Sequence, residues 1–137
     1  MLNIDLHNHS NASDGLLAPR ALIELAHARR CDMIALTDHD TTAGLAEAEA
    51  AAAAVGLGFV RGVEISATWP TPDEHADIRP ITVHIVGLDI DPADAVLAAG
   101  LLSVRDGRLA RARLMGADLE RVGVSAILEP ASALAES

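Results

Sequence analysis

The chain has 137 residues, 50% of them hydrophobic and 22% charged, which suits about one globular domain and is too short for a closed (β/α)8 barrel of about 250 residues. Its net charge of −10 argues against a broad, sequence-independent grip on nucleic-acid backbone. All 10 basic residues are Arg, so mechanisms that need a Lys amine or a carbamylated Lys are excluded, and only Phe59 and Trp69 could stack on bases.

Short apolar runs alternate with alanine-rich stretches of helix length, a pattern typical of βα units around a parallel sheet. Strands are expected over residues 2–6, 33–37, 59–65 and 81–88. A helix is expected over residues 21–29, with Pro19 in its first turn. A second helix is expected over residues 43–55, capped by Thr41 or Thr42 and ended by Gly56. The expected fold class is therefore α/β, with about four parallel strands and intervening helices.

The remaining segments are polar or helical. Residues 68–80 are rich in proline and acidic residues, which predicts a loop. Residues 93–122 are expected to form one or two helices, with three glycines as candidate interruptions, and residues 125–137 a loop or a frayed helix. Without a repeat or a linker, residues 1–137 are expected to form one architectural unit.

The chain has the features of a cytoplasmic protein. Its single cysteine, Cys31, allows no disulfide within the chain and fits a reducing compartment. The first residues lack the basic and apolar regions of a signal peptide, and no apolar run approaches the ~18 residues of a membrane span. A cytoplasmic location without a membrane partner is therefore expected.

Candidate metal ligands recur near the ends of the expected strands. His7 and His9 are two residues apart, so their side chains point to one face of a strand. Further histidines and acidic residues lie within or just after the next expected strands. Taken alone, each of them could be a core, surface or turn residue without a metal. Their coincidence with four successive strands predicts one metal site with the ligands His7, His9, Asp14, His39, Glu64 and His84.

Two histidines fall outside this pattern. His27 and His75 are assigned to the surface or to helix packing, although His75 could approach the site if its loop folds over it. Mixed imidazole and carboxylate donors favour Mn²⁺, with Zn²⁺ or Fe²⁺ as alternatives, and two or three ions per complete site. Two ions about 3.5–4 Å apart are typical of phosphoester hydrolysis by an activated water.

Two aspartates flank His39. Asp38 or Asp40 could fix the tautomer of the imidazole from behind, as carboxylates commonly do for ligating histidines. Asp40 could instead complement the dipole of the following helix at its amino end.

A basic stripe lies on the expected long helix. Arg105, Arg108 and Arg111 are spaced at i, i+3 and i+6, which places them on one side of a helix. Arginine forks suit phosphate oxygens, so these residues are candidates for substrate binding. The alternative is a solvated helix face that pairs with Asp106 and Asp118.

Four motifs, taken in order, carry a specific resemblance. They are D-L-H-N-H-S-N-A-S-D-G, A-L-T-D-H-D-T-T-A-G-L, G-V-E-I-S-A-T-W and V-H-I-V-G-L-D-I-D-P. The chain resembles the PHP (polymerase and histidinol phosphatase) family of metal-dependent phosphoesterases from residue 2 to about residue 125. It is most similar to bacterial 3′,5′-nucleoside bisphosphate phosphatases, some of which act as 5′→3′ exoribonucleases. The stretch L-L-S-V-R-D-G-R-L-A-R-A-R also resembles their helix near the bound nucleotide.

The resemblance implies a fold, a site and a reaction. The fold would be the N-terminal part of a distorted (β/α)7 barrel, and the family's metal centre holds three ions. Metal ligation is implied for the six candidates above, with catalytic roles for His7, His9, Asp14, His39 and Glu64. Contacts to substrate phosphate are implied for Arg105, Arg108 and Arg111. The implied partner is a small nucleotide or short RNA, not extended duplex DNA.

The chain departs from the family in length. The family's later ligands, in an Ala-His-Pro motif and an Asp-x-His pair, have no counterpart here, so residues 1–137 match only the N-terminal portion of a PHP domain. One alternative is a truncated, non-catalytic metal-binding module, whose open edge favours self-association. A further alternative is a metal-dependent amidohydrolase, whose common form needs the Lys that this chain lacks.

Overall fold

The computed structural model describes residues 1–69 and 81–135. They divide into two compact units, Met1–Leu101 and Leu102–Ser137. The boundary falls inside one continuous helix. Of the loop expected over residues 68–80, Thr68 and Trp69 instead end a strand, and the other residues lie outside the described part of the chain.

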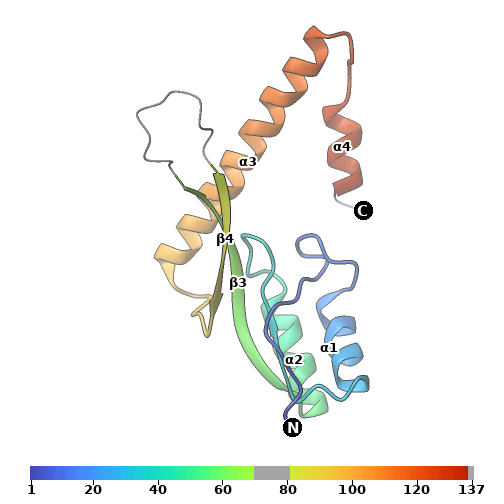
Figure 1. The fold of residues 1–137 in the computed structure, drawn as a ribbon, viewed down its shortest axis with the longest axis vertical. Coiled ribbons are helices and arrows are strands. Elements are labelled where there is room, and N and C mark those ends of the chain that lie inside the picture. Colours follow the sequence, from blue (N-terminus) through green and yellow to red (C-terminus); the bar gives the residue numbers. More distant parts are fainter. Residues whose placement is uncertain (70–80, 136–137) are drawn as a thin grey trace. The chain divides into compact units, whose positions relative to one another are not determined.

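The first unit contains a sheet with the strand order β1-β2-β3-β4. Strands β1 (Ile4–Asp5), β2 (Met33–Leu36) and β3 (Gly58–Trp69) are parallel. They are joined by the helices α1 (Pro19–Ala28) and α2 (Leu45–Val55), as Figure 1 shows. The expected βα arrangement is confirmed for these three strands, although β1 is shorter and β3 longer than the sequence predicts.

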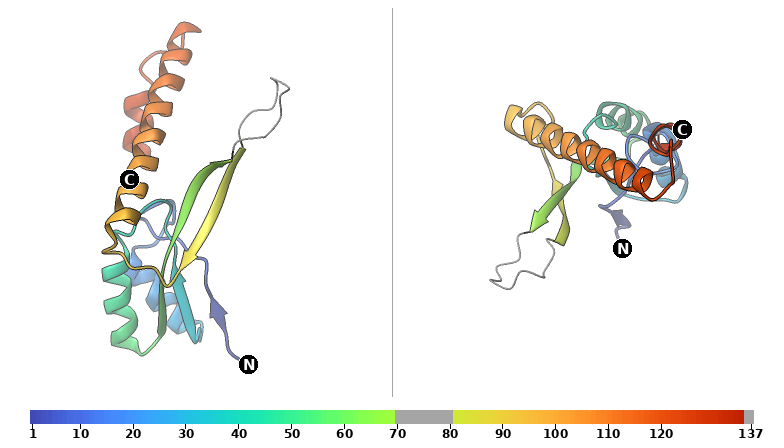
Figure 2. Two further views of the ribbon diagram at one scale, coloured as in Figure 1. Left: turned by 90° about the vertical axis from the view of Figure 1, so that its left-hand side faces the viewer. Right: turned by 90° about the horizontal axis from the view of Figure 1, so that it is seen from above.

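Strand β4 (Ile81–Leu88) differs from the prediction of a fourth parallel strand. It pairs with β3 in the antiparallel direction, from Trp69 opposite Ile81 to Gly62 opposite Leu88. The two long strands run side by side in both views of Figure 2. A parallel neighbour needs a crossover of a dozen or more residues, usually a helix, and the sequence offers no helical segment between these two strands.

The core of the first unit is aliphatic. Helices α1 and α2 bury Ile23 and a row of alanines against β2 and the start of β3. Pro19 lies at the amino end of α1, and Gly56 ends α2 in the left-handed conformation (φ 72°), as expected. The predicted threonine cap is wrong, because Gly44 is the N-cap of α2 and no side chain caps it.

The remaining helices are α3 (Ala95–Arg121) and α4 (Leu128–Ala135). Helix α3 is continuous through Gly100, Gly107 and Gly116. Of the two possibilities for this segment, one helix or two, the structure confirms one helix. Helix α4 occupies most of the tail that was expected to be a loop or a frayed helix. Among the described helices, none is both long and apolar enough to cross a membrane.

Candidate metal centre

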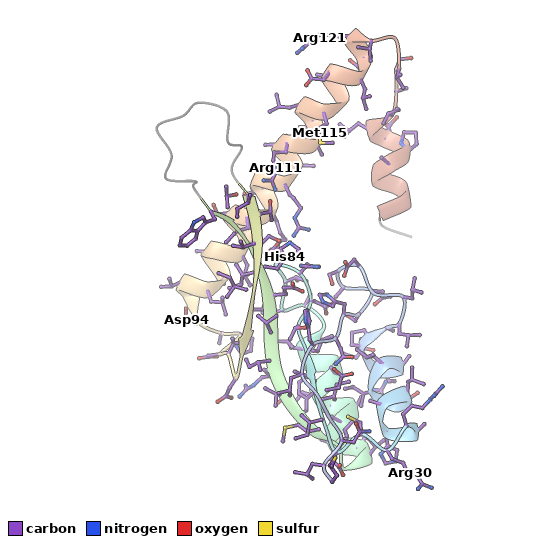
Figure 3. All side chains as sticks on the ribbon, in the orientation of Figure 1. Arg30, His84, Asp94, Arg111, Met115 and Arg121 are labelled. Carbon is purple, nitrogen blue, oxygen red and sulfur yellow. The ribbon has the colours of Figure 1, made fainter. Side chains whose placement is uncertain are left out.

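Six side chains with metal-ligating atoms come together in the first unit. They come from the residues that follow β1 and β2, from the loop before α1, and from β3 and β4, where Figure 3 labels His84. They are the six ligands that the sequence predicts: His7, His9, Asp14, His39, Glu64 and His84. The structure therefore places every predicted ligand in one cluster, including His84, which shares the face of the β3–β4 pair with Glu64 because it lies opposite Ser66.

Glu64 is the centre of this cluster. Its side chain is 7% exposed, and its Oε2 atom lies 2.8 Å from Nε2 of His7 and 3.0 Å from Nε2 of His9. Its Oε1 atom lies 3.1 Å from Nδ1 of His84. Nε2 of His39 is 3.7 Å from Oε2. One buried carboxylate thus faces four imidazoles.

The environment of Glu64 keeps its carboxyl group ionised. Burial by itself would raise the pKa of Glu64, because burial penalises the charged form. The hydrogen bond with His7 and the charges of His39, His7 and His9 oppose it, and the pKa of Glu64 lies below its ordinary value of 4.5. Glu64 is therefore a carboxylate at neutral pH, which is the form that binds a cation.

Asp14 reaches the cluster from the loop before α1. Its Oδ1 atom lies 3.2 Å from Nδ1 of His9, and its Oδ2 atom lies 3.6 Å from Nε2 of His39. The ring centroids of His9 and His39 are 4.7 Å apart, as are those of His39 and His84. The donor atoms of both carboxylates and of the imidazoles consequently converge on the same small space.

The chemistry and spacing of these donors fit divalent metal ions. The donors form three overlapping groups, in each of which the ligand atoms lie within 4.8 Å of one another: His7, His9 and Glu64; His9, Asp14 and His39; and His39, Glu64 and His84. Nδ1 of His39 is buried and has no hydrogen-bond partner in the described part of the chain, so this site contains a polar atom that those residues do not satisfy. Mixed imidazole and carboxylate donors suit Mn²⁺, Zn²⁺ or Fe²⁺ better than Ca²⁺ or Mg²⁺.

The aspartates that flank His39 bond elsewhere. Asp38 accepts hydrogen bonds from Ser10 and Ser13 in the loop before α1. Asp40 accepts a 2.7 Å bond from the backbone nitrogen of Ser66. Because the buried Nδ1 of His39 has no partner among the described residues, the expected tautomer-fixing contact is wrong.

The alternative role of Asp40 at a helix terminus is wrong as well. Helix α2 begins after its N-cap Gly44, and the acidic residue in its first turn is Glu47. Asp40 precedes this turn and adopts φ 51°, a left-handed conformation that Asp tolerates better than most residues. Its buried carboxylate bonds to the backbone of Ser66 in β3 and lies outside the first turn of α2.

The predicted substrate-binding arginines lie in the second unit. Arg105, Arg108 and Arg111 are exposed residues of α3, on which Figure 3 labels Arg111. Asp118, named above as an alternative partner for them, forms a 2.8 Å ion pair with Arg121. The role of the three arginines stays a prediction.

The two other histidines have different outcomes. His27 is exposed on α1, in agreement with its assignment to the surface. His75 lies outside the described residues.

Gly15 is expected to tolerate no side chain without a loss of stability, because a Cβ atom there would clash with the carbonyl oxygen of His9. Gly15→Ala should force the ligand-bearing loop apart and lower the free energy of unfolding by about 1–3 kcal/mol. Denaturant unfolding monitored by circular dichroism measures this change. Gly107→Ala is the matched control, since its Cβ would meet nothing within 4 Å, and an equal effect of both substitutions would contradict the prediction.

Three comparisons with known proteins identify what this chain is similar to. The family model described as PHP domain matches residues 5–116. A 3′,5′-nucleoside bisphosphate phosphatase of Chromobacterium violaceum is 55% identical over 96% of the chain, and a 5′-3′ exoribonuclease of Haemophilus influenzae is 42% identical over 96%. The chain spans 43% and 45% of the lengths of these two relatives.

A solved structure from Chromobacterium violaceum, described as an amidohydrolase with bound sulfate and no metal, is similar in both sequence and fold. It is 55% identical, with a TM-score of 0.77 over 93% of this chain and 42% of that one. This similarity supports a partial barrel, in which three parallel strands and one antiparallel strand form a curled sheet.

Proposed function

The chain belongs to the PHP domain family, and from this premise we propose that it forms part of a metal-dependent phosphoesterase. The proposed reaction is hydrolysis of the phosphomonoester of a small nucleotide, such as a 3′,5′-nucleoside bisphosphate, or cleavage at the 5′ ends of short RNA. The observation that carries the proposal is the convergence of four imidazoles on the buried carboxylate of Glu64. The names of the relatives support the nucleotide substrate.

The six clustered residues would hold two or three divalent ions, with Mn²⁺ favoured. Bound ions of this kind lower the pKa of water and stabilise charge on phosphate oxygens. The chain itself would contribute the ligands: the carboxylates of Glu64 and Asp14 supply negative charge, and the imidazoles supply nitrogen donor atoms. In the reaction the oxygen of water bonds to phosphorus, the ester P–O bond breaks, and a proton from that water ends on the leaving oxygen, so that phosphate and an alcohol are released.

A direct assay tests this proposal. The complete protein with Mn²⁺ is expected to release inorganic phosphate from 3′-phosphoadenosine 5′-phosphate, and removal of the metal by a chelator is expected to abolish the release. Absence of turnover with metal bound would contradict the proposal and favour a non-catalytic metal-binding module. The chain of residues 1–137 alone, assayed in parallel, shows whether this part suffices.

Arg108 is proposed to bind substrate phosphate through its guanidinium group. Arg108→Ala is expected to raise KM for the bisphosphate by about tenfold, the effect of losing one charge-assisted hydrogen bond, and to leave the metal content unchanged. Steady-state kinetics and elemental analysis measure the two quantities. Arg113→Ala is the matched control, because position 113 lies on the other side of α3. A loss of metal from the Arg108 variant would show that its role is different.

A second candidate is an amidohydrolase, which the description of the similar solved structure favours. The common carbamylated-Lys bridge is excluded, because all 10 basic residues are Arg. The names of two relatives, a phosphatase and an exoribonuclease, support the phosphoesterase. Release of ammonia or a free amine from an amide, without release of phosphate, would favour the second candidate.

We also propose a cytoplasmic location and self-association. Cys31 is a free thiol, which is typical of reducing compartments. Ile81 and Ile85 of β4 are 51% and 54% exposed, and exposed apolar strands favour association.

A further inference from the structure

The loop that connects β1 to α1 belongs to no helix or strand and carries three of the six clustered residues, His7, His9 and Asp14. Three backbone bonds hold it internally, of which two end on the carbonyl oxygen of Ser10. Bonds between Asn8 and Thr37 join its beginning to the residue after β2. The part of the loop after Asn8 carries His9 and Asp14, and it needs another attachment if these two ligands are to keep their positions.

Asp38 provides that attachment. Its Oδ1 atom accepts 2.7 Å hydrogen bonds from the backbone nitrogen of Ser10 and from Oγ of Ser13, and its Oδ2 atom accepts a 2.7 Å bond from Oγ of Ser10. Ser10 is fully buried, and Asp38 is 2% exposed. Hydrogen bonds to an ionised carboxylate are short and about twice as strong as neutral ones, so this network is a strong local attachment.

The network adjoins three ligands at once. Ser10 follows His9, Ser13 precedes Asp14, and Asp38 precedes His39 in the chain. Asp38 itself belongs to none of the groups of donors that could hold an ion. Its carboxylate therefore joins the two stretches of chain that carry His9, Asp14 and His39, without adding a ligand to this group.

We infer that Asp38 is a positioning residue, which presets the His9, Asp14 and His39 group for a divalent cation through its bonds to Ser10 and Ser13. The inference rests on the metal centre of the proposed function. A carboxylate suits this place because it offers only acceptors to the donors that face it. An amide would turn an NH₂ group toward the backbone nitrogen or a hydroxyl of the serines, and a buried donor would lose its partner.

The test is calorimetric titration of the metal-free complete protein with Mn²⁺. Asp38→Asn is expected to weaken Mn²⁺ binding by about 10–100-fold, which is the usual effect of removing a group that orients ligands. Phosphate release by this variant is expected to recover when Mn²⁺ is raised by the same factor. Asp91→Asn is the matched control, because Asp91 is exposed and its carboxylate accepts a hydrogen bond from the backbone nitrogen of Ala93, two residues further along the chain.

Ser13→Ala gives a second, milder variant in case Asp38→Asn does not fold. It removes one of the three bonds and is expected to weaken Mn²⁺ binding by about 2–10-fold. Unchanged Mn²⁺ affinity together with a lower melting temperature would overturn the inference and make Asp38 a purely structural residue. A loss of activity that excess Mn²⁺ does not restore would overturn it as well.

The proposed function and the inference about Asp38 can be contradicted independently of each other. If the unsubstituted protein binds Mn²⁺ but releases no phosphate, the proposed function fails, while the change in Mn²⁺ affinity still tests the role of Asp38.

Discussion

Replacing His7 and His9 together by Ala is expected to weaken Mn²⁺ binding to the complete protein by more than 100-fold. The reason is that both imidazoles face Glu64 at about hydrogen-bond distance and would be direct ligands. Loss of a group that merely orients a ligand already costs about 10–100-fold in affinity. Elemental analysis after gel filtration, together with calorimetric titration, measures the effect.

His27→Ala is the control for this double substitution. His27 is an exposed residue of α1, away from the predicted ligands in the sequence, and its loss is expected to leave metal content and phosphate release unchanged. Retention of the full metal content by the variant without His7 and His9 would refute the assignment of both residues as ligands.

Glu64→Gln is expected to have the second large effect. Glu64 belongs to two of the three groups of donor atoms, and an amide oxygen lacks the charge that attracts a cation. We expect Mn²⁺ affinity to fall by at least 100-fold, again because loss of a direct ligand should exceed the ~10–100-fold cost of an orienting group, and phosphate release to fall with it. Glu49→Gln, at an exposed position of α2, is the matched control.

Glu64→Gln is also expected to change how the free energy of unfolding of the metal-free protein depends on pH. Because the pKa of Glu64 is lowered in the folded state, its ionised form stabilises the fold above the ordinary value of 4.5, and this contribution is lost as the pH falls through the folded-state pKa. Glu64→Gln should therefore lower the free energy of unfolding at pH 6, with a difference that shrinks toward acid pH. A difference that grows on acidification would contradict the sign of the shift.

Hydrophobic patterning predicted most of the fold but not the direction of β4. The apolar runs marked all four strands, and the helical stretches between the first three required parallel pairing. The segment before Ile81 is too rich in proline to be a crossover helix. That signal was present in the sequence, and it would have predicted antiparallel pairing with β3.

Part of the candidate site was predictable because three of its histidines follow strands β1 and β2, whereas Glu64 and His84 lie within β3 and β4 and not at the expected strand ends. Parallel pairing brings the residues after β1 and β2 together, so His7, His9 and His39 follow from topology. His84 reaches Glu64 differently, through its position opposite Ser66 in the antiparallel pair. His84 was therefore expected near Glu64, as the structure shows, although the parallel direction predicted for its strand is wrong.

The contacts of Asp38 were not predictable from spacing. Sequence proximity pointed to His39, whereas the carboxylate bonds to serines that are distant in the sequence. Such a choice depends on the rotation of one side chain in a buried environment, which periodicity does not record. The serines of the motif after His9 were the available signal, since each offers a hydroxyl donor.

The parallel pairing of β1 with β2 and of β2 with β3 has a kinetic consequence. Each pair joins segments separated by a whole helix, and such non-local contacts form slowly during folding. The ligands of the cluster therefore come together only when these parallel strands have paired. A cation that binds after this step stabilises the native state alone, so excess Mn²⁺ is expected to slow unfolding and leave the refolding rate unaltered.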